Sequence, residues 1–304
     1  MRDCDNDAVL TAALFLVAVL LTWPVPRLLP RLTVLERVPG PALLLWQAIS
    51  LSAIFAAVSL APLTVLQFVR EGRSLPAPAA NVPLLVAGLA VSALIIVRLL
   101  VQGDRVGRNL RAARAEHAEL VDLLGAASGS GDGMPGGRFT VLEHPTPTAY
   151  CIPGRRRRVV LTDSTIHALP ADELDAVLAH ERAHLRLRHD LVLEFFTVLH
   201  TTVPRVIRSD RGIQEVRMLI ELLADRAACR AVGPVPVARA LLTLAGGAAP
   251  DATLGVAGAP AARRMALLAD QRPHRVLAAT VLLAAVLVIG VTGVIAWGAL
   301  LGVG

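Results

Sequence analysis

Residues 170–190 read PADELDAVLAHERAHLRLRHD, and this stretch decides how the chain is interpreted. It contains His180, Glu181 and His184 in the pattern H-E-x-x-H. Apolar residues surround the motif at helical spacing, and Pro170 followed by two acidic residues is typical of a helix start. Residues four apart lie one turn above each other on a helix, so the two imidazoles can converge on one metal ion.

The motif predicts a zinc-dependent hydrolase. Zinc held by three protein ligands keeps a position for water and lowers the pKa of that water to about 7. We therefore expect one Zn²⁺ bound by His180 and His184, with Glu181 acting as general base. The alternative is two surface histidines on a polar helix, and the apolar residues around the motif disfavour it.

A third ligand is expected downstream. A metzincin would have glycine at position 187 and histidine at position 190, but these are Leu187 and Asp190. Residues 214–232 are predicted to be helical and carry Glu221 and Asp225 four apart on one face. This pair suits a ligand carboxylate, Glu221, backed by a second carboxylate, Asp225, that orients a histidine. The alternative is a solvated acidic face paired with arginines of the same helix.

The rest of the chain is predominantly apolar. It has 304 residues, of which 55% are hydrophobic, and its mean hydropathy of +0.61 excludes a disordered chain and disfavours an ordinary soluble domain. Apolar stretches over about residues 8–25, 41–69, 82–101 and 276–301 are long enough to cross a bilayer as helices. The first stretch might be read as a cleaved signal peptide, but three aspartates and one arginine precede it, so we expect a permanent helix.

The predicted fold class is a mainly α membrane protein with four transmembrane helices. Residues 1–103 hold three of these helices, residues 104–275 form an α+β zincin-like metalloprotease domain, and residues 276–304 hold the fourth helix. Strands are expected at 139–143 and 158–162, after a glycine-rich break at 128–137. The edge of the strand at 158–162 is expected to bind an extended peptide.

The basic residues, all of them arginines, predict the orientation. They concentrate in the first loop, around the end of the third span and before the fourth. By the positive-inside rule, both termini lie outside and the protease domain lies in the cytoplasm. The spans lack acidic residues, which disfavours an ion transporter.

Two further patterns limit the partners. The arginine run at 155–158 has no aromatic stacking platform beside it, so contact with membrane lipid is expected and nucleic-acid binding is not. Cys4, Cys151 and Cys229 are too widely spaced for a disulfide framework or a Cys-ligated zinc finger. His189 and Asp190, directly after the motif, are interpreted either as a capping or orienting pair or as structural residues.

Three segments carry a family resemblance: RRVVLTD at 157–163, the motif stretch at 170–190, and ELLADRAACRAVG at 221–233. Together they resemble the BlaR/MecR-type integral-membrane zinc metallopeptidases and, more distantly, the HtpX-like membrane proteases. The resemblance implies that His180, His184 and Glu221 bind zinc and that Glu181 is catalytic. The best-known members carry a penicillin-binding sensor domain after the last span, and we expect this chain to lack one.

The resemblance also implies a biological role. The expected substrate is a protein or peptide in a bacterial cell membrane or its cytoplasm. Cleavage of a transcriptional repressor would give regulatory proteolysis and signal transduction, whereas cleavage of membrane proteins would give quality control. A non-catalytic, zinc-binding membrane sensor is the remaining alternative.

Overall fold

The computed structural model describes residues 2–71, 78–128, 139–154, 157–206, 208–247, 258–270 and 272–301. Among these, four helical stretches are long and apolar enough to cross a membrane by length and composition: Val9–Arg31, Pro39–Arg70, Leu85–Gly125 and Arg275–Leu301. Each overlaps one of the stretches predicted from hydropathy. Residues 129–137 of the predicted glycine-rich break, and Arg155 and Arg156 of the arginine run, lie outside the described residues.

The chain divides into two compact units, and unit 1 contains the apolar helices. It comprises Met1–Arg105, Phe196–Val216 and His274–Gly304. Within it, α1 (Arg2–Thr22), α3 (Pro39–Glu71) and α11 (Arg275–Leu301) pack on one another, and the short helices α2 (Val25–Leu28), η1 (Leu29–Arg31) and η2 (Thr33–Arg37) connect α1 to α3. Their shared core includes Ala18, Ala56, Ala296 and Ala299, and such small residues let apolar helices approach closely.

The second apolar helix departs from one expectation. Pro62 predicts an end or a kink, and α3 does not end there but continues to Glu71. Proline removes one backbone hydrogen bond, and packing against neighbouring helices makes this tolerable in apolar helices.

Unit 2 comprises Val106–Phe195 and Arg217–Pro273 and contains a three-stranded sheet. The strand order is β1 (Thr140–Leu142), β3 (Arg158–Thr162), β2 (Ala149–Ile152), with β1 parallel and β2 antiparallel to β3. The two predicted strands are confirmed as β1 and β3, whereas β2 was missed. The expectation that β3 offers a free edge is wrong, because β3 is the central strand and β2 is an outer one.

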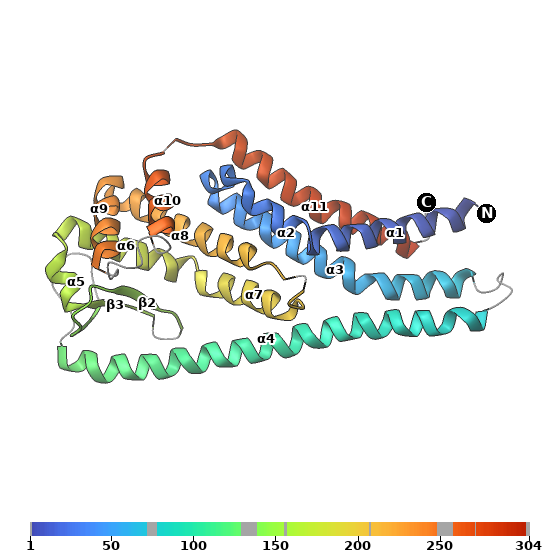
Figure 1. Cartoon of the computed structure of the whole chain (residues 1–304), viewed down its shortest axis with the longest axis horizontal. Coiled ribbons are helices and arrows are strands. Elements are labelled where there is room, and N and C mark those ends of the chain that lie inside the picture. Colours follow the sequence, from blue (N-terminus) through green and yellow to red (C-terminus); the bar gives the residue numbers. More distant parts are fainter. Residues whose placement is uncertain are drawn as a thin grey trace. The chain divides into compact units, whose positions relative to one another are not determined.

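The helices of unit 2 cover the sheet and carry the motif (Figure 1). They include α5 (Asp163–Ala168), α6 (Ala171–Arg186), α9 (Pro234–Gly247) and α10 (Gly258–Leu268). Three further helices have residues in both units: α4 (Pro78–Ser128), α7 (His189–Thr202) and α8 (Asp210–Val232). The core joins Leu161 of β3, Leu178 of α6, Ala228 of α8 and Val237 of α9, all buried. This core fixes α6 from behind and leaves its histidine-bearing face turned toward α8.

Candidate metal centre

Helix α6 places both histidines of the motif on one face, as the four-residue spacing requires. Their Nε2 atoms lie 3.1 Å apart. Glu221, from α8, closes the group: its carboxylate oxygens lie 3.5 Å from His180 Nε2 and 3.6 Å from His184 Nε2. One donor atom from each of the three residues falls within 4.8 Å of the others.

This arrangement fits a single zinc ion. Ligand atoms about 2.0–2.2 Å from a tetrahedral zinc ion lie about 3.3 Å apart, close to the separations found here. The Nε2 atoms of His180 and His184 are close enough to share either one proton or one metal ion. Two histidines and one carboxylate also leave one coordination position free, as catalytic zinc sites do.

The outer nitrogen of His180 is held by a buried carboxylate. Asp225, 2% exposed, lies with Oδ1 3.0 Å from His180 Nδ1. Arg264 of α10 donates to both oxygens of Asp225, at 2.7 Å from Nε and 2.6 Å from Nη2, and its Nη1 lies 3.2 Å from Glu221. A histidine whose Nε2 binds metal carries its proton on Nδ1, so Asp225 accepts that proton's hydrogen bond and fixes the ring.

His184 is oriented by another histidine. His189 is buried, and its Nδ1 lies 2.9 Å from His184 Nδ1. Arg188 adopts the left-handed conformation, with φ of 52°, between the end of α6 and the start of α7. Such a residue stops a helix and redirects the chain, which here brings His189 back against the motif. Asp190 does not join this contact and instead lies 3.5 Å from Arg114.

Glu181 lines the same cavity as the three metal-binding candidates. The cavity has a volume of about 600 Å³. Cys151 of β2 lines it too, so Cys151 and Glu181 share this cavity. An apolar wall from α9, formed by Val237, Ala240, Leu241 and Leu244, completes one side.

The pKa values of several groups in the cluster are shifted from their ordinary values. Burial lowers the pKa of His180, but hydrogen bonds with Asp225 and Glu221 outweigh burial and raise this pKa to about 9. Burial and the neighbouring His180 lower the pKa of His184 to about 4. Burial raises the pKa of Glu181 above its ordinary value. Burial, together with Glu181, also raises the pKa of Cys151 to about 12, so Cys151 remains a protonated thiol donor.

The structure brings together the residues that the sequence singled out and adds one that it did not. His180, Glu181, His184, Glu221 and Asp225 all line one cavity. Arg264 was counted only among the arginines that flank the fourth span, yet it is bound to Asp225, 39 residues away in sequence. The short helix α10 contains no spacing of histidines or acidic residues that would mark Arg264 as part of a metal site.

A histidine pair on one helix, a carboxylate from a later helix and a glutamate beside them define the zinc metallopeptidase class. Residues 117–249 match the family model described as Peptidase family M48. The chain is 39% identical over 118 residues to plastoglobule-localized metallopeptidase 48, chloroplastic, of Arabidopsis thaliana. This alignment covers 35% of the chain, which spans about a third (34%) of the relative's length. No solved structure matches the chain.

The family match and the relative support a zinc metallopeptidase with hydrolase activity. The match covers the residues that form the cluster on α6 and α8. Arg264 of α10 lies beyond the matched range.

Zinc binding is expected to release about one proton at neutral pH. His180 is protonated below its pKa of about 9 and must lose this proton to bind metal, whereas His184 is already neutral. Affinity therefore rises with pH up to about 9 and levels off above it. Isothermal titration in buffers of different ionisation enthalpy measures the proton count, and identical enthalpies in all buffers would contradict this assignment.

Asp225→Asn is expected to lower zinc affinity about 10- to 100-fold, because the variant loses the charged partner that orients His180. Competition with a chromogenic chelator measures the affinity. Asp172→Asn, at an exposed position at the start of α6, is the matched control and should bind zinc like the unmodified protein. Equal losses in the two variants would show that Asp225 has no specific role.

Proposed function

We propose that the chain is an integral-membrane, zinc-dependent endopeptidase that holds one zinc ion through His180, His184 and Glu221. The observation that carries the proposal is the meeting of these donor atoms within 4.8 Å in a cavity that Glu181 also lines. A purely structural zinc site is closed by four protein ligands, whereas three ligands beside an open cavity suit catalysis. This geometry disfavours the non-catalytic sensor.

In the proposed hydrolysis of a peptide bond, Glu181 would transfer protons, while Asp225 and His189 would orient the two imidazoles. Bound zinc would polarise the scissile carbonyl and acidify the attacking water. Glu181 would accept a proton from a water molecule in the cavity and later return it to the leaving amine. Burial raises the pKa of Glu181, which suits this return because a more basic carboxylate keeps the proton until the amine accepts it. Asp225 and His189 keep the two imidazoles fixed during these transfers.

The surroundings of Glu181 suit an extended peptide. The outer strand β2 passes along the cavity through Ala149, Tyr150 and Cys151. Backbone pairing with an outer strand binds a peptide with little demand on its sequence. The apolar side chains of α9 on the same cavity would receive an apolar side chain of the substrate.

The cellular role divides into two proposals that share this activity. The BlaR/MecR-type resemblance favours regulatory cleavage of a repressor, and the HtpX-like resemblance favours quality control of membrane proteins. Four apolar helices are compatible with membrane association. We retain the arrangement with both termini outside and the protease unit in the cytoplasm, on the basis of the arginine distribution.

Glu181→Gln is expected to keep zinc and lose proteolysis by about 10²- to 10⁴-fold, because the amide cannot accept the proton. Zinc content and cleavage of a fluorogenic peptide library by detergent-solubilised protein measure the two effects. Glu119→Gln, at an exposed position on α4, is the control and should leave both unchanged.

Cleavage by Glu181→Gln at the unmodified rate would contradict the mechanism. The same variant also serves to trap substrates in cells by crosslinking. Recovery of a DNA-binding repressor would support regulatory proteolysis, and recovery of damaged membrane proteins would support quality control.

A further inference from the structure

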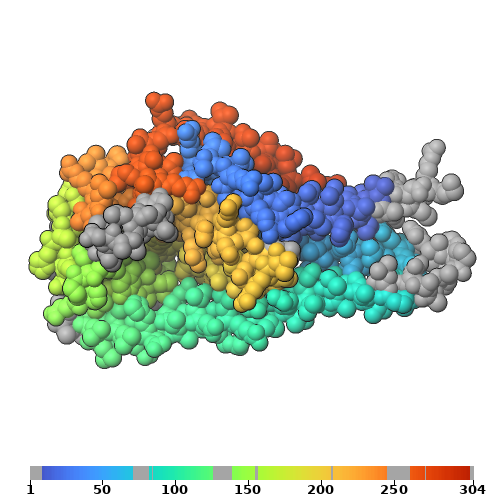
Figure 2. Space-filling view, in the orientation of Figure 1, coloured from blue at the N-terminus to red at the C-terminus, as the bar shows by residue number. Residues whose placement is uncertain are grey.

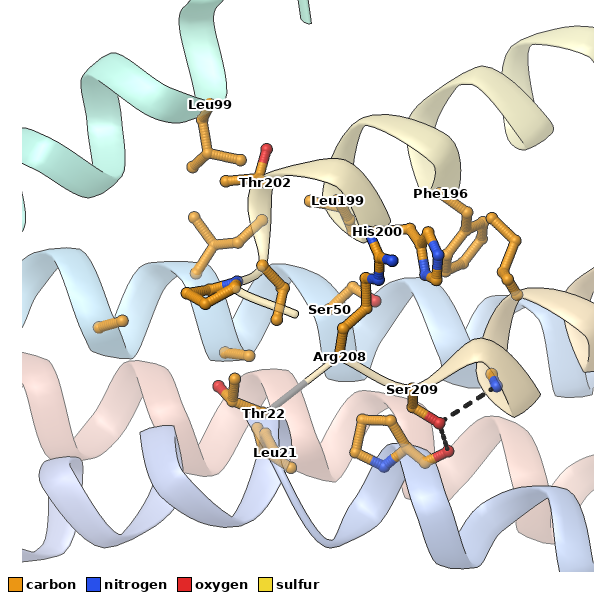
Figure 3. A pocket seen from close by; sticks show the side chains of 18 of the residues that line it. Leu21, Thr22, Ser50, Leu99, Phe196, Leu199, His200, Thr202, Arg208 and Ser209 are labelled. Atoms are coloured by element: carbon orange, nitrogen blue, oxygen red, sulfur yellow. Dashed lines mark hydrogen bonds between the residues drawn. The ribbon is translucent and has the colours of Figure 1, made fainter. Parts of the chain in front are cut away.

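Unit 1 contains a second cavity, separate from the metal centre (Figure 3). Its walls come from α1, α2, α3, α4, α7, the segment that leads into α8 and the first turn of α8, and its volume is about 260 Å³. The lining is predominantly apolar and includes Leu21, Ile54, Leu99, Phe196 and Leu199. Three of these helices contain candidate membrane spans, so in a bilayer a hydrocarbon chain would lie next to these walls.

Charged and polar groups gather at one part of this cavity. Figure 3 shows Arg208 reaching toward His200 of α7. Asp210 lies 3.2 Å from His200 Nε2 and 3.8 Å from Arg208 Nε. The Asp210 side chain is 73% exposed and the Arg208 side chain 28%, so the carboxylate is turned outward. The two terminal nitrogens of Arg208 have no acidic partner among the described residues, which leaves them available to an anion.

The chain around Arg208 is basic. Residues 203–211 contain three arginines and one aspartate, and residues 23–38 contain three arginines and one glutamate, so each segment has a formal charge of 3 − 1 = +2. Ser209 Oγ donates to the carbonyl of Pro26 at 3.1 Å and joins the two segments. Figure 2 shows yellow atoms from the region around residues 203–211 against the blue atoms of the first helices. An anionic headgroup would be attracted to this rim.

One buried donor in the lining also lacks an acceptor. Trp46 of α3 is 4% exposed, and its indole Nε1 has no hydrogen-bond partner among the described residues. Buried polar groups are seldom left without a partner, because the loss costs free energy. Phosphate or ester oxygens of a bound amphiphile are acceptors that would satisfy it.

We propose that this cavity binds one anionic membrane phospholipid, with an acyl chain between the apolar helices and the phosphate at Arg208. The apolar walls exclude a headgroup, and the basic rim favours an anionic lipid over a zwitterionic one. The site is independent of peptidase activity, so it stands or falls separately from the proposed function.

Quenching of Trp46 fluorescence tests the proposal. In full-length protein that carries Trp23→Phe and Trp297→Phe, Trp46 is the sole tryptophan. Phosphatidylglycerol with brominated acyl chains, added to the detergent-solubilised protein, should quench it saturably, at about five-fold lower concentration than brominated phosphatidylcholine. Arg208→Gln should remove this preference and Arg208→Lys should keep it. Arg205→Gln, at an exposed position on the same segment, is the matched control and should also keep it.

Three results would overturn the proposal. One is equal half-quenching concentrations for the two lipids in the unmodified background. Another is an Arg208→Gln variant that retains the preference while folding normally by circular dichroism. The third is the absence of quenching by either lipid, which would mean that no acyl chain enters the cavity next to Trp46.

Discussion

The buried carboxylate of Asp225 is the point at which three helices of unit 2 meet. It lies on α8, accepts two hydrogen bonds from Arg264 of α10 and contacts His180 of α6. Burial alone raises the pKa of Asp225, but these contacts outweigh burial and hold the pKa below its ordinary value. An unpaired buried charge is strongly destabilising, so α6, α8 and α10 must be assembled together. The position of His180, the candidate metal ligand, thus depends on this ion pair.

The apolar core behind α6 fixes the position of this helix from the side opposite the cavity. Leu174 and Leu178 anchor the helix against β3, α8 and α9, while the histidines one face away remain in the cavity. On the cavity side, β2 brings Cys151 to Glu181 and α9 contributes apolar side chains. Helix α6 therefore lies between the apolar core and the polar cavity. Glu181 on this helix is buried, and burial keeps its pKa raised.

The parts of the site that sequence could predict are those governed by helical periodicity. His180 and His184, and then Glu221 and Asp225, are each four residues apart, and this spacing alone places each pair on one face. Arg264 could not be predicted, because its partner lies 39 residues away and no local pattern records that contact. The tie between His184 and His189 depends on the left-handed Arg188 and was left open.

In the sheet too, a feature that depends on contacts between distant residues could not be predicted from the sequence. The strands at 140–142 and 158–162 follow runs rich in β-branched residues, and both were predicted. Strand β2 has four residues, Ala149–Ile152, and exists through its pairing with β3. A segment this short carries too little alternation to be recognised from sequence, so the free edge of the sheet was assigned to the wrong strand.

X-ray absorption spectroscopy at the zinc K-edge of the metal-loaded protein measures the ligand set of the proposed metal centre directly. If His180, His184 and Glu221 hold the ion, we expect two imidazole nitrogens and oxygens from one carboxylate and one water around the zinc, all at about 2.0–2.2 Å. A sulfur scatterer at about 2.3 Å would implicate Cys151 as a ligand, and a third imidazole would implicate His189. Either result would contradict a centre formed by His180, His184 and Glu221.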